Sequence, residues 1–114
     1  MVSGLYNLKK KEIEEIFKRG KAYRGDFLIL RINKNSLPFS RWSFIVPASS
    51  CQEAVKRNRL KRQLRENIRE KLAGIKSGVD GIVLALPDVI GRTHEAIDKE
   101  VDKLLNLAGV LRQN

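Results

Sequence analysis

The chain has 114 residues, 42% of them hydrophobic, which predicts one domain with a single core over residues 1–114. The formal net charge is +10, from 23 Lys and Arg against 13 Asp and Glu. One cysteine, Cys51, excludes an intramolecular disulfide and a cysteine-rich zinc module. No apolar run approaches the roughly 20 residues that span a bilayer, and the N-terminal stretch lacks the apolar core of a signal peptide. We therefore expect a cytoplasmic protein without a membrane partner.

The first part of the chain predicts a helix followed by two strands. Leu8 to Arg19 places apolar residues on one face and is closed by Gly20, with Asn7 as the expected N-cap. Residues 23–32 have the composition of a strand, and a polar turn separates them from a second strand over residues 41–46. The short connection predicts that these two strands form an antiparallel hairpin.

The second part predicts a helix, a buried strand and a last helix. The long helix is expected over residues 52–73, with Ser49 or Ser50 as its cap. The apolar run 82–86 is typical of a strand covered on both faces. Thr93 is the expected cap of a final helix with one apolar stripe. The order helix, strand, strand, helix, strand, helix predicts an α+β fold, a two-layer sandwich of helices on one sheet.

The long helix is strongly basic. Residues 56–71 carry eight cationic side chains, and the first ten of these residues hold six cations and no acid. Like charges on neighbouring helical turns repel one another. A polyanion would relieve that repulsion, so nucleic acid is the expected partner. A solvated, salt-bridged surface and a membrane-surface helix are the weaker alternatives.

The position of the cations on this helix predicts a cleft. An apolar stripe is expected to face the sheet: Leu60, Leu64, Ile68 and Leu72. Arg57 and Lys61 project in nearly the same direction, one or two turns closer to the N-terminus. Because burying their charges is costly, the first two turns are expected to extend beyond the core. Arg57, Lys61 and Arg65 would then line an open cleft.

Residues 54–66 carry a resemblance to a known family. They read Ala-Val-Lys-Arg-Asn-Arg-Leu-Lys-Arg-Gln-Leu-Arg-Glu. This closely resembles the signature of the bacterial ribonuclease P protein subunit, Ala-Val-x-Arg-Asn-x-x-Lys-Arg with a further Arg three residues on. Residues 8–25 resemble the opening of the same family, and the likeness spans most of the chain. It implies an α-β sandwich whose basic helix lies in a left-handed crossover between parallel strands.

The resemblance also implies a function. Proteins of this family bind a large catalytic RNA, and the holoenzyme hydrolyses one phosphodiester bond of precursor tRNA to release the 5′ leader. The catalytic groups belong to the RNA, so the protein alone is expected to be inactive. Mg²⁺, bound mainly by the RNA, is the implied cofactor. The implied partners are the catalytic RNA and precursor tRNA, with no obligate protein partner.

Site residues follow from the matched positions. The polar residues matching the RNA-facing helix are Arg57, Asn58, Arg59, Lys61, Arg62, Arg65 and Arg69. Phe17 matches an aromatic residue that contacts the single-stranded leader, and Lys9 and Lys10 are placed with it. Burial in the core is the alternative for Phe17. No catalytic or metal-ligating residue is expected in the protein.

Two departures from the family pattern bear on this expectation. Ile13 stands where the family often has a second phenylalanine, so base stacking is lost there. Residues 47–53, Pro-Ala-Ser-Ser-Cys-Gln-Glu, replace a Lys-rich segment, so leader or metal contacts through that loop are in doubt.

Other readings of the sequence remain. A non-enzymatic RNA-binding module, such as a ribosomal protein, is the main alternative function. A DNA-binding helix-turn-helix is disfavoured because no second helix is expected a short turn away. Trp42, Tyr23 and Phe44 could offer a stacking surface, although strand aromatics are more often core. Asp80 and Asp88 flank the buried strand and are a weak signal for a hydrated metal.

Overall fold

The computed structural model describes residues 5–112. The predicted domain, residues 1–114, and the N-terminal stretch judged not to be a signal peptide both reach outside this range. The elements in chain order are β1 (Tyr6–Asn7), α1 (Lys10–Arg19), β2 (Lys21–Arg24), β3 (Leu28–Lys34), β4 (Arg41–Ile45), α2 (Ala54–Lys71), β5 (Val79–Ala85) and α3 (His94–Ala108). Single 3₁₀ turns, Leu72–Gly74 and Pro87–Val89, follow α2 and β5. The predicted α+β class is confirmed.

The five strands form one mixed sheet in the order β1-β4-β5-β3-β2. β4 is parallel to both β1 and β5, whereas β3 is antiparallel to β5 and to β2. The predicted strand over residues 23–32 is therefore two strands, β2 and β3, that turn at residues 25–27. The predicted hairpin with residues 41–46 is wrong, because β5 lies between β3 and β4. The apolar β5 takes the centre because only there are both its faces and both its edges covered.

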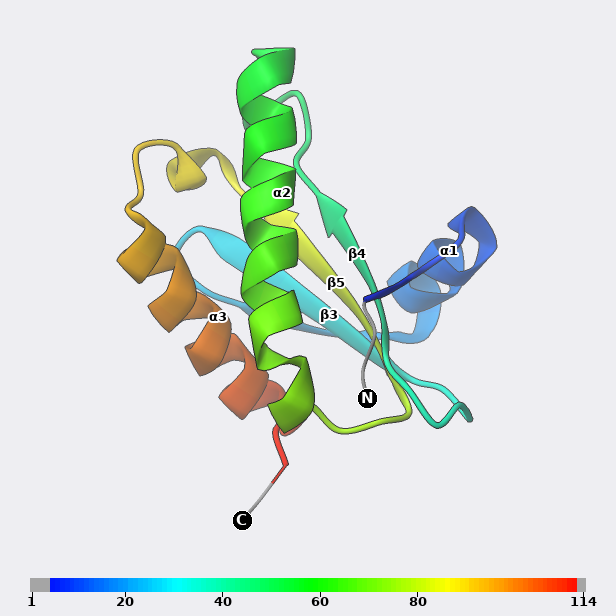
Figure 1. The fold of residues 1–114 in the computed structure, drawn as a ribbon. Helices are drawn as coiled ribbons and strands as arrows, with labels where there is room; N and C mark the ends of the chain where they lie inside the picture. Colours follow the sequence, from blue (N-terminus) through cyan, green and yellow to red (C-terminus); the bar gives the residue numbers. More distant parts are fainter. Residues whose placement is uncertain (1–4, 113–114) are drawn as a thin grey trace.

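The connection from β4 to β5 passes through α2. In Figure 1 both strands run upward, α2 lies in front of the sheet, and β5 lies to the left of β4. This is the left-handed sense that the resemblance implied, against the usual right-handed preference. The consequence is that α2 lies over β4 near one edge of the sheet, where its N-terminal half has room to extend.

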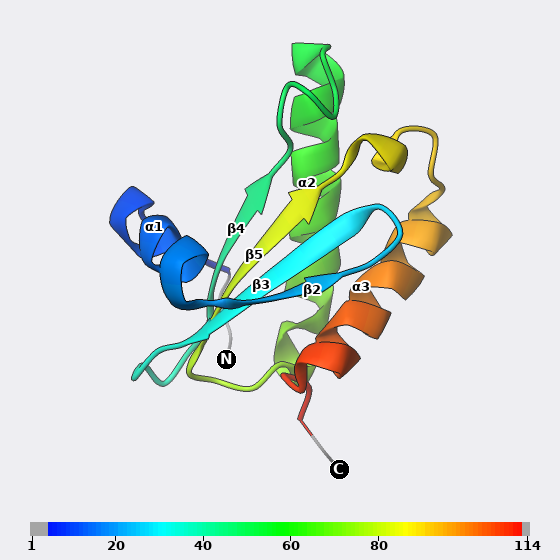
Figure 2. The same cartoon turned by 180° about the vertical axis from the view of Figure 1, so that it is seen from behind.

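The helices cover the two faces of the sheet unequally. α2 and α3 lie on one face, and α1 lies on the other (Figures 1 and 2). The larger apolar cluster joins α2 and α3 to the sheet through residues such as Leu30, Leu64 and Leu104. A small second cluster under α1 contains Leu8, Ile16 and Ile82. The two-layer sandwich thus has α1 as a short addition on its other face.

The helix caps differ from the predictions at two of three places. Thr93 caps α3 as predicted, and its Oγ1 accepts from the N–H of Ala96 at 3.1 Å. α1 has Lys9 rather than Asn7 at its N-cap, because Asn7 belongs to β1. The Lys9 N–H donates instead to Glu12 Oε1 at 2.7 Å.

At α2 the predicted serine cap is also wrong. The helix begins at Ala54 with Glu53 at the N-cap position, later than the predicted residue 52. Ser50 is buried, and its Oγ donates to the carbonyl of Ala85 at 2.8 Å. Its hydroxyl therefore joins the loop before α2 to the end of β5. Within the described residues, no helix is long and apolar enough to cross a membrane.

Trp42 is a core residue, as the more favoured interpretation predicted. Its side chain is fully buried in β4, and its Nε1–H donates to Ser40 Oγ at 2.9 Å. The ring packs on Gly81 of β5, where even a Cβ would overlap it. The absence of a side chain at Gly81 thus leaves room for the Trp42 ring.

Candidate nucleic-acid interface

The N-terminal half of α2 extends beyond the core, as predicted. Its buried residues begin at Leu64, whereas Leu60 is half-buried and the Val55 side chain is 71% exposed. The upper turns of α2 rise past the ends of the strands in Figure 1. The first turn contains no acidic residue, so the helix presents its free N–H groups and its cations together, an arrangement that favours anions.

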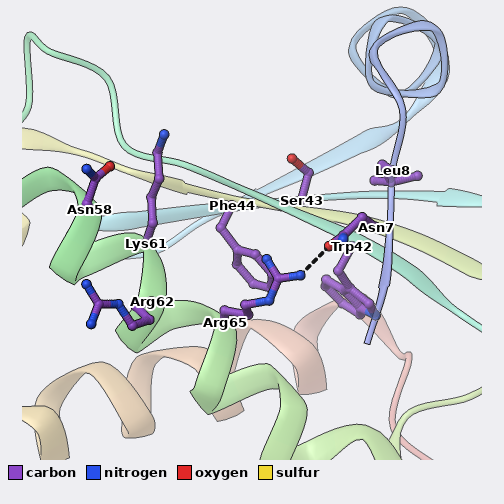
Figure 3. A pocket seen from close by; sticks show the side chains of 9 residues that line it. All are labelled: Asn7, Leu8, Trp42, Ser43, Phe44, Asn58, Lys61, Arg62 and Arg65. Atoms are coloured by element: carbon purple, nitrogen blue, oxygen red, sulfur yellow. Dashed lines mark hydrogen bonds between the residues drawn. The ribbon is translucent and has the colours of Figure 1, made fainter. Parts of the chain in front are cut away.

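A groove with a volume of about 430 Å³ runs between this half of α2 and the β1–β4 edge of the sheet (Figure 3). We call it the α2 groove. Its lining residues come from β1, β4, α2 and the start of the chain segment before α1: Asn7, Leu8, Trp42, Ser43, Phe44, Asn58, Lys61, Arg62 and Arg65. Four of these are predicted RNA-binding residues, all of them from α2.

Within the groove the side chains have distinct positions. Arg65 reaches across to β1, where its Nη2 donates to Asn7 Oδ1 at 2.6 Å (Figure 3). The Lys61 and Arg62 side chains are exposed, and no carboxylate of residues 5–112 lines the groove. Two cations are therefore free to meet a ligand, while the third also holds the groove walls together.

The floor of the groove includes an open strand edge. In the described part of the chain, β1 pairs only with Arg41 and Trp42 of β4, and the last bond of this pairing runs from the Leu8 N–H to the Trp42 carbonyl at 3.0 Å. Because backbone groups alternate between the two sides of a strand, the N–H and C=O of Phe44 point to this open edge. The half-buried Phe44 ring packs on the core from the same place. The packing agrees with the core interpretation of Phe44, and a stacking role stays a prediction.

Arg57 does not line the groove, which corrects the predicted cleft of Arg57, Lys61 and Arg65. Its Nη1 turns back and donates to the carbonyls of Cys51 and Gln52, at 3.0 and 3.1 Å. These carbonyls precede the first turn of α2 and have no helical partner, so a guanidinium with several donors satisfies both. A contact between Arg57 and RNA stays a prediction.

Arg59 and Arg69 face other directions. A shallow depression of about 310 Å³ on the side of α2 nearer α3 is lined by Arg59, Arg62, Gln63, Glu66 and His94. Arg69 forms an ion pair with Glu66, with Nη2 and Oε2 2.7 Å apart. The hydrogen bond from Arg69 lowers the pKa of Glu66, and the same bond raises the pKa of Arg69. Arg62 is thus the one predicted residue that lines both hollows described here.

Phe17 lies on α1, away from the α2 groove. The neighbouring residue Ile16 is buried, whereas the Phe17 side chain is 42% exposed. The guanidinium of Arg31, on β3, lies 4.8 Å from the Phe17 ring centroid. The ring is therefore available at the surface with a cation over it. Lys9 and Lys10, at the start of α1, are exposed as well.

Asp80 is engaged by neighbouring side chains. Its carboxylate accepts from Arg41 Nη2 at 2.8 Å and from Asn35 Nδ2 at 2.6 Å, and Arg41 also pairs with Glu12 of α1. These bonds to Asp80 raise the pKa of Arg41 in spite of its partial burial. Arg41 of β4 is thus joined to β5 through Asp80 and to α1 through Glu12. Among residues 5–112, no three His, Cys, Asp or Glu side chains form a group that could hold a metal ion.

Two residues that line the α2 groove were not predicted from the sequence. Asn7 and Ser43 line the groove because β1 pairs with β4. A two-residue strand has no periodicity from which its pairing could be predicted. Arg31 could have been found, because strand alternation places it on the face opposite Leu30 and hence toward α1.

The chain is a small, basic α+β protein with a cation-lined groove beside a left-handed β-α-β unit. The family model described as Ribonuclease P matches residues 6–109. The ribonuclease P protein component of Synechocystis sp. is 31% identical over 101 residues, which are 88% of this chain and 82% of that protein. That of Microcystis aeruginosa is 33% identical over 112 residues, 94% and 93% of the two chains. The chain belongs to the ribonuclease P protein family, as the motif at residues 54–66 indicated.

A solved structure agrees with this assignment. The RNase P protein of Staphylococcus aureus aligns with a TM-score of 0.85 and 25% sequence identity. The alignment covers 94% of this chain and 98% of that one. The likeness therefore includes the sheet, the crossover and all three helices described above.

Proposed function

We propose that this chain is the protein subunit of a ribonuclease P, which binds the catalytic RNA and the 5′ leader of precursor tRNA while the leader is removed. The observation that carries the proposal is the α2 groove, a hollow lined by three cations and no carboxylate. Membership of the family makes an RNA subunit the expected partner. The phosphodiester hydrolysis itself is assigned to the RNA.

The α2 groove suits an RNA backbone. Lys61 and Arg62 are exposed cations that can replace the counterions of phosphates, which is the main source of affinity in such complexes. Asn58 and the open N–H of Phe44 add neutral donors along the same groove. These contacts recognise a backbone of regular charge spacing and need no particular base sequence.

The leader is assigned to the face that carries α1. An exposed ring such as Phe17 can stack on an unpaired base whatever its identity. Arg31 already lies over the ring, so it is placed to contact the phosphate of a stacked nucleotide. Lys9 and Lys10 extend the positive charge toward the start of α1.

Mg²⁺ is proposed to be held mainly by the RNA. Asp80 is one of the two acids that the sequence offered as a weak signal for a metal site. Its carboxylate already accepts hydrogen bonds from Arg41 and Asn35. The protein's contribution would be electrostatic. Its cations lower the repulsion between the catalytic RNA and precursor tRNA where the metal ions bind. This effect should matter most when Mg²⁺ is scarce.

The test is cleavage of a precursor tRNA by the cognate catalytic RNA at low Mg²⁺, with and without the protein. Strong stimulation at the mature 5′ end, and no cleavage by the protein alone, is the expected result. Tight RNA binding without stimulation would instead favour a general RNA-binding module. It would also point to residues 47–53, which lack the family's lysines, as the reason.

A further inference from the structure

A second cation-lined groove lies at the other edge of the sheet, with a volume of about 640 Å³. We call it the β2–β3 groove. Its walls are β2, the end of β3, the loop before β5 and the C-terminal end of α3. The lining residues are Arg19, Lys21, Tyr23, Ile32, Asn33, Lys34, Asn35, Lys76, Ser77, Gly78, Val79, Ala108, Gly109 and Val110.

The charge of this groove is of one sign. Four cations line it, Arg19, Lys21, Lys34 and Lys76, and no Asp or Glu does. They come from three segments of the chain, residues 19–21, the end of β3 and the loop before β5, and all four are exposed. Among residues 5–112, Arg19 is the one of these four with a carboxylate partner, an exposed pair with Glu15 at 3.1 Å that is worth little in water. The fold therefore brings Lys34 and Lys76 beside the Arg19–Lys21 pair, from which both are distant in the sequence.

Backbone hydrogen bonds join the parts of the rim of the groove. The N–H of Lys76 donates to the carbonyl of Val110 at 2.8 Å, which attaches the loop to the end of α3. The N–H of Asn35 donates to the carbonyl of Gly78 at 2.9 Å, which attaches the same loop to β3. Gly78 has φ of 76°, a conformation that favours glycine. The backbone segments that carry Lys34 and Lys76 are thus joined by hydrogen bonds.

The floor adds an aromatic surface. Tyr23 is half-buried between the walls, and the ammonium of Lys21 lies 5.7 Å from its ring centroid. Ile32 and Val79 complete an apolar base beneath the cations. A floor that can stack a base, with cations on the rim, is the arrangement that single-stranded nucleic acid binds without sequence preference.

The two grooves are separate. They share no lining residue. The α2 groove follows the β1–β4 edge, and the β2–β3 groove follows the opposite edge, with β5 between them. Figure 2 shows β2 and β3 on the far side of β5 from β4, and the end of α3 at the opposite end of the molecule from the first turn of α2.

We propose that the β2–β3 groove binds the phosphodiester backbone of a second RNA segment, so that the protein bridges two RNA segments held at opposite edges of its sheet. The identity of the two RNAs rests on the proposed function. The positive charge of the groove is seen in the structure itself and does not depend on that function. The bound segment belongs either to the catalytic RNA or to precursor tRNA, two sources of the same chemistry.

The test compares the variant K34A/K76A with wild type and with a matched control, K99A/K103A. The control removes the same charge from exposed positions of α3 that line neither groove. Binding of the intact protein to the cognate catalytic RNA, and of the holoenzyme to precursor tRNA, is measured across a salt series. A short oligouridylate serves as an RNA probe that needs neither partner. Thermal unfolding verifies that each variant is folded.

Loss of two phosphate contacts should lower the salt slope of log K by about 1.4 and weaken binding at physiological salt by about tenfold. The control should leave the slope unchanged, because charges outside a contact release no counterions. A loss confined to the catalytic RNA or to precursor tRNA supports the proposal and identifies the source. If K34A/K76A equals K99A/K103A with every RNA while wild type still stimulates cleavage, the groove is not an RNA site and the proposed function stands. If wild type itself binds none of these RNAs, both proposals fail.

Discussion

At the scale of single residues, the cations of α2 divide into those that hold the fold and those that face the groove. Arg57 and Lys61 are one helical turn apart, and in projection they look equivalent. In the structure Arg57 satisfies two loop carbonyls, whereas Lys61 lines the α2 groove. The sequence predicts the side of the helix on which a cation lies, but not whether a nearby loop will use it.

This difference predicts different results for two substitutions. Lys61→Ala should weaken binding of the catalytic RNA about three- to tenfold and leave stability unchanged, because it removes one phosphate contact. Arg57→Ala should in addition lower the free energy of unfolding by about 1 kcal/mol, because two carbonyl acceptors lose a charged donor. Filter binding and urea unfolding separate the two effects. Equal stability of both variants would contradict the structural role of Arg57.

Phe17 allows a second test at this scale. Its ring is exposed, so Phe17→Ala should cost less than about 1 kcal/mol of stability. The loss of one stacked base should weaken binding of a leader-bearing precursor by about five- to fiftyfold, while affinity for a leaderless tRNA is retained. Fluorescence titration of the holoenzyme with both RNAs measures the difference. Leu107→Ala, which removes an exposed apolar side chain of α3, is the control. A large stability loss in the Phe17 variant would support the core alternative instead.

At the scale of elements, the sequence predicts the long helices with a regular apolar pattern well. It predicts neither the short strand β1 nor the position of β5 at the centre of the sheet. The apolar stripe of α3 is long enough to fix its buried face, and Thr93 begins it as predicted. β1 has two residues and no pattern of its own. The place of β5 between β3 and β4 depends on pairing across the whole chain, which local composition does not contain.

Glu100 connects α3 to the turn between β2 and β3, a contact that the sequence does not predict. An acidic residue on a helix with many charges is expected to be exposed to solvent. Glu100 is buried, and its carboxylate accepts from the N–H groups of Asp26, Phe27 and Leu28 at 2.8 to 3.0 Å. α3 thereby holds the turn between β2 and β3.

Glu100→Gln removes the charge and one acceptor from these bonds. We expect it to lower the free energy of unfolding by about 2 kcal/mol, since hydrogen bonds to a buried charged group are worth more than neutral ones. Urea unfolding at neutral pH measures the change. Glu95→Gln, an exposed position of the same helix, should have little effect. An unchanged midpoint for Glu100→Gln would show that the turn does not depend on the carboxylate.

The contact between α2 and α3 predicts a dependence on pH. Lys71 donates to Asp98, which lowers the pKa of Asp98 below its ordinary value of 3.8. A lowered pKa means that this stabilisation is complete above about pH 4 and is lost as the pH falls through the folded-state value. Burial opposes the charge of Lys71, but its bonds to Asp98 and Asp102 outweigh that and raise its pKa.

Asp98→Asn should therefore be less stable than wild type at neutral pH, by about 0.5 to 1 kcal/mol for a partly exposed pair. The two proteins should converge at the acid end of the titration, where wild type also loses the carboxylate charge. Thermal unfolding between pH 7 and pH 2.5 follows the difference. A gap that stayed constant or widened toward acid would contradict the assignment to this ion pair.

At the scale of the whole molecule, charge is segregated along the chain and then rearranged by the fold. Residues 1–73 carry 18 cations and 7 acids, a net +11, whereas residues 74–114 carry 5 and 6, a net −1. From this the sequence predicts a basic first part and the α2 site within it. It does not predict the β2–β3 groove, because Lys76 comes from the part without net positive charge and joins the others only through tertiary contacts.

Two grooves at opposite edges predict independent effects on the complete reaction. Cleavage is measured at low Mg²⁺, with protein and precursor tRNA both below saturation, so that the initial rate reports every binding step. K61A/R62A and K34A/K76A should each lower this rate, and the combined variant should lower it by the product of the two factors, within about twofold, because distant sites without shared partners contribute additively to the free energy. A combined variant no slower than the worse double variant would mean that the grooves do not act as separate sites. The additive outcome would instead show that the two grooves contribute independently to the reaction, as separate RNA sites at opposite edges of the sheet should.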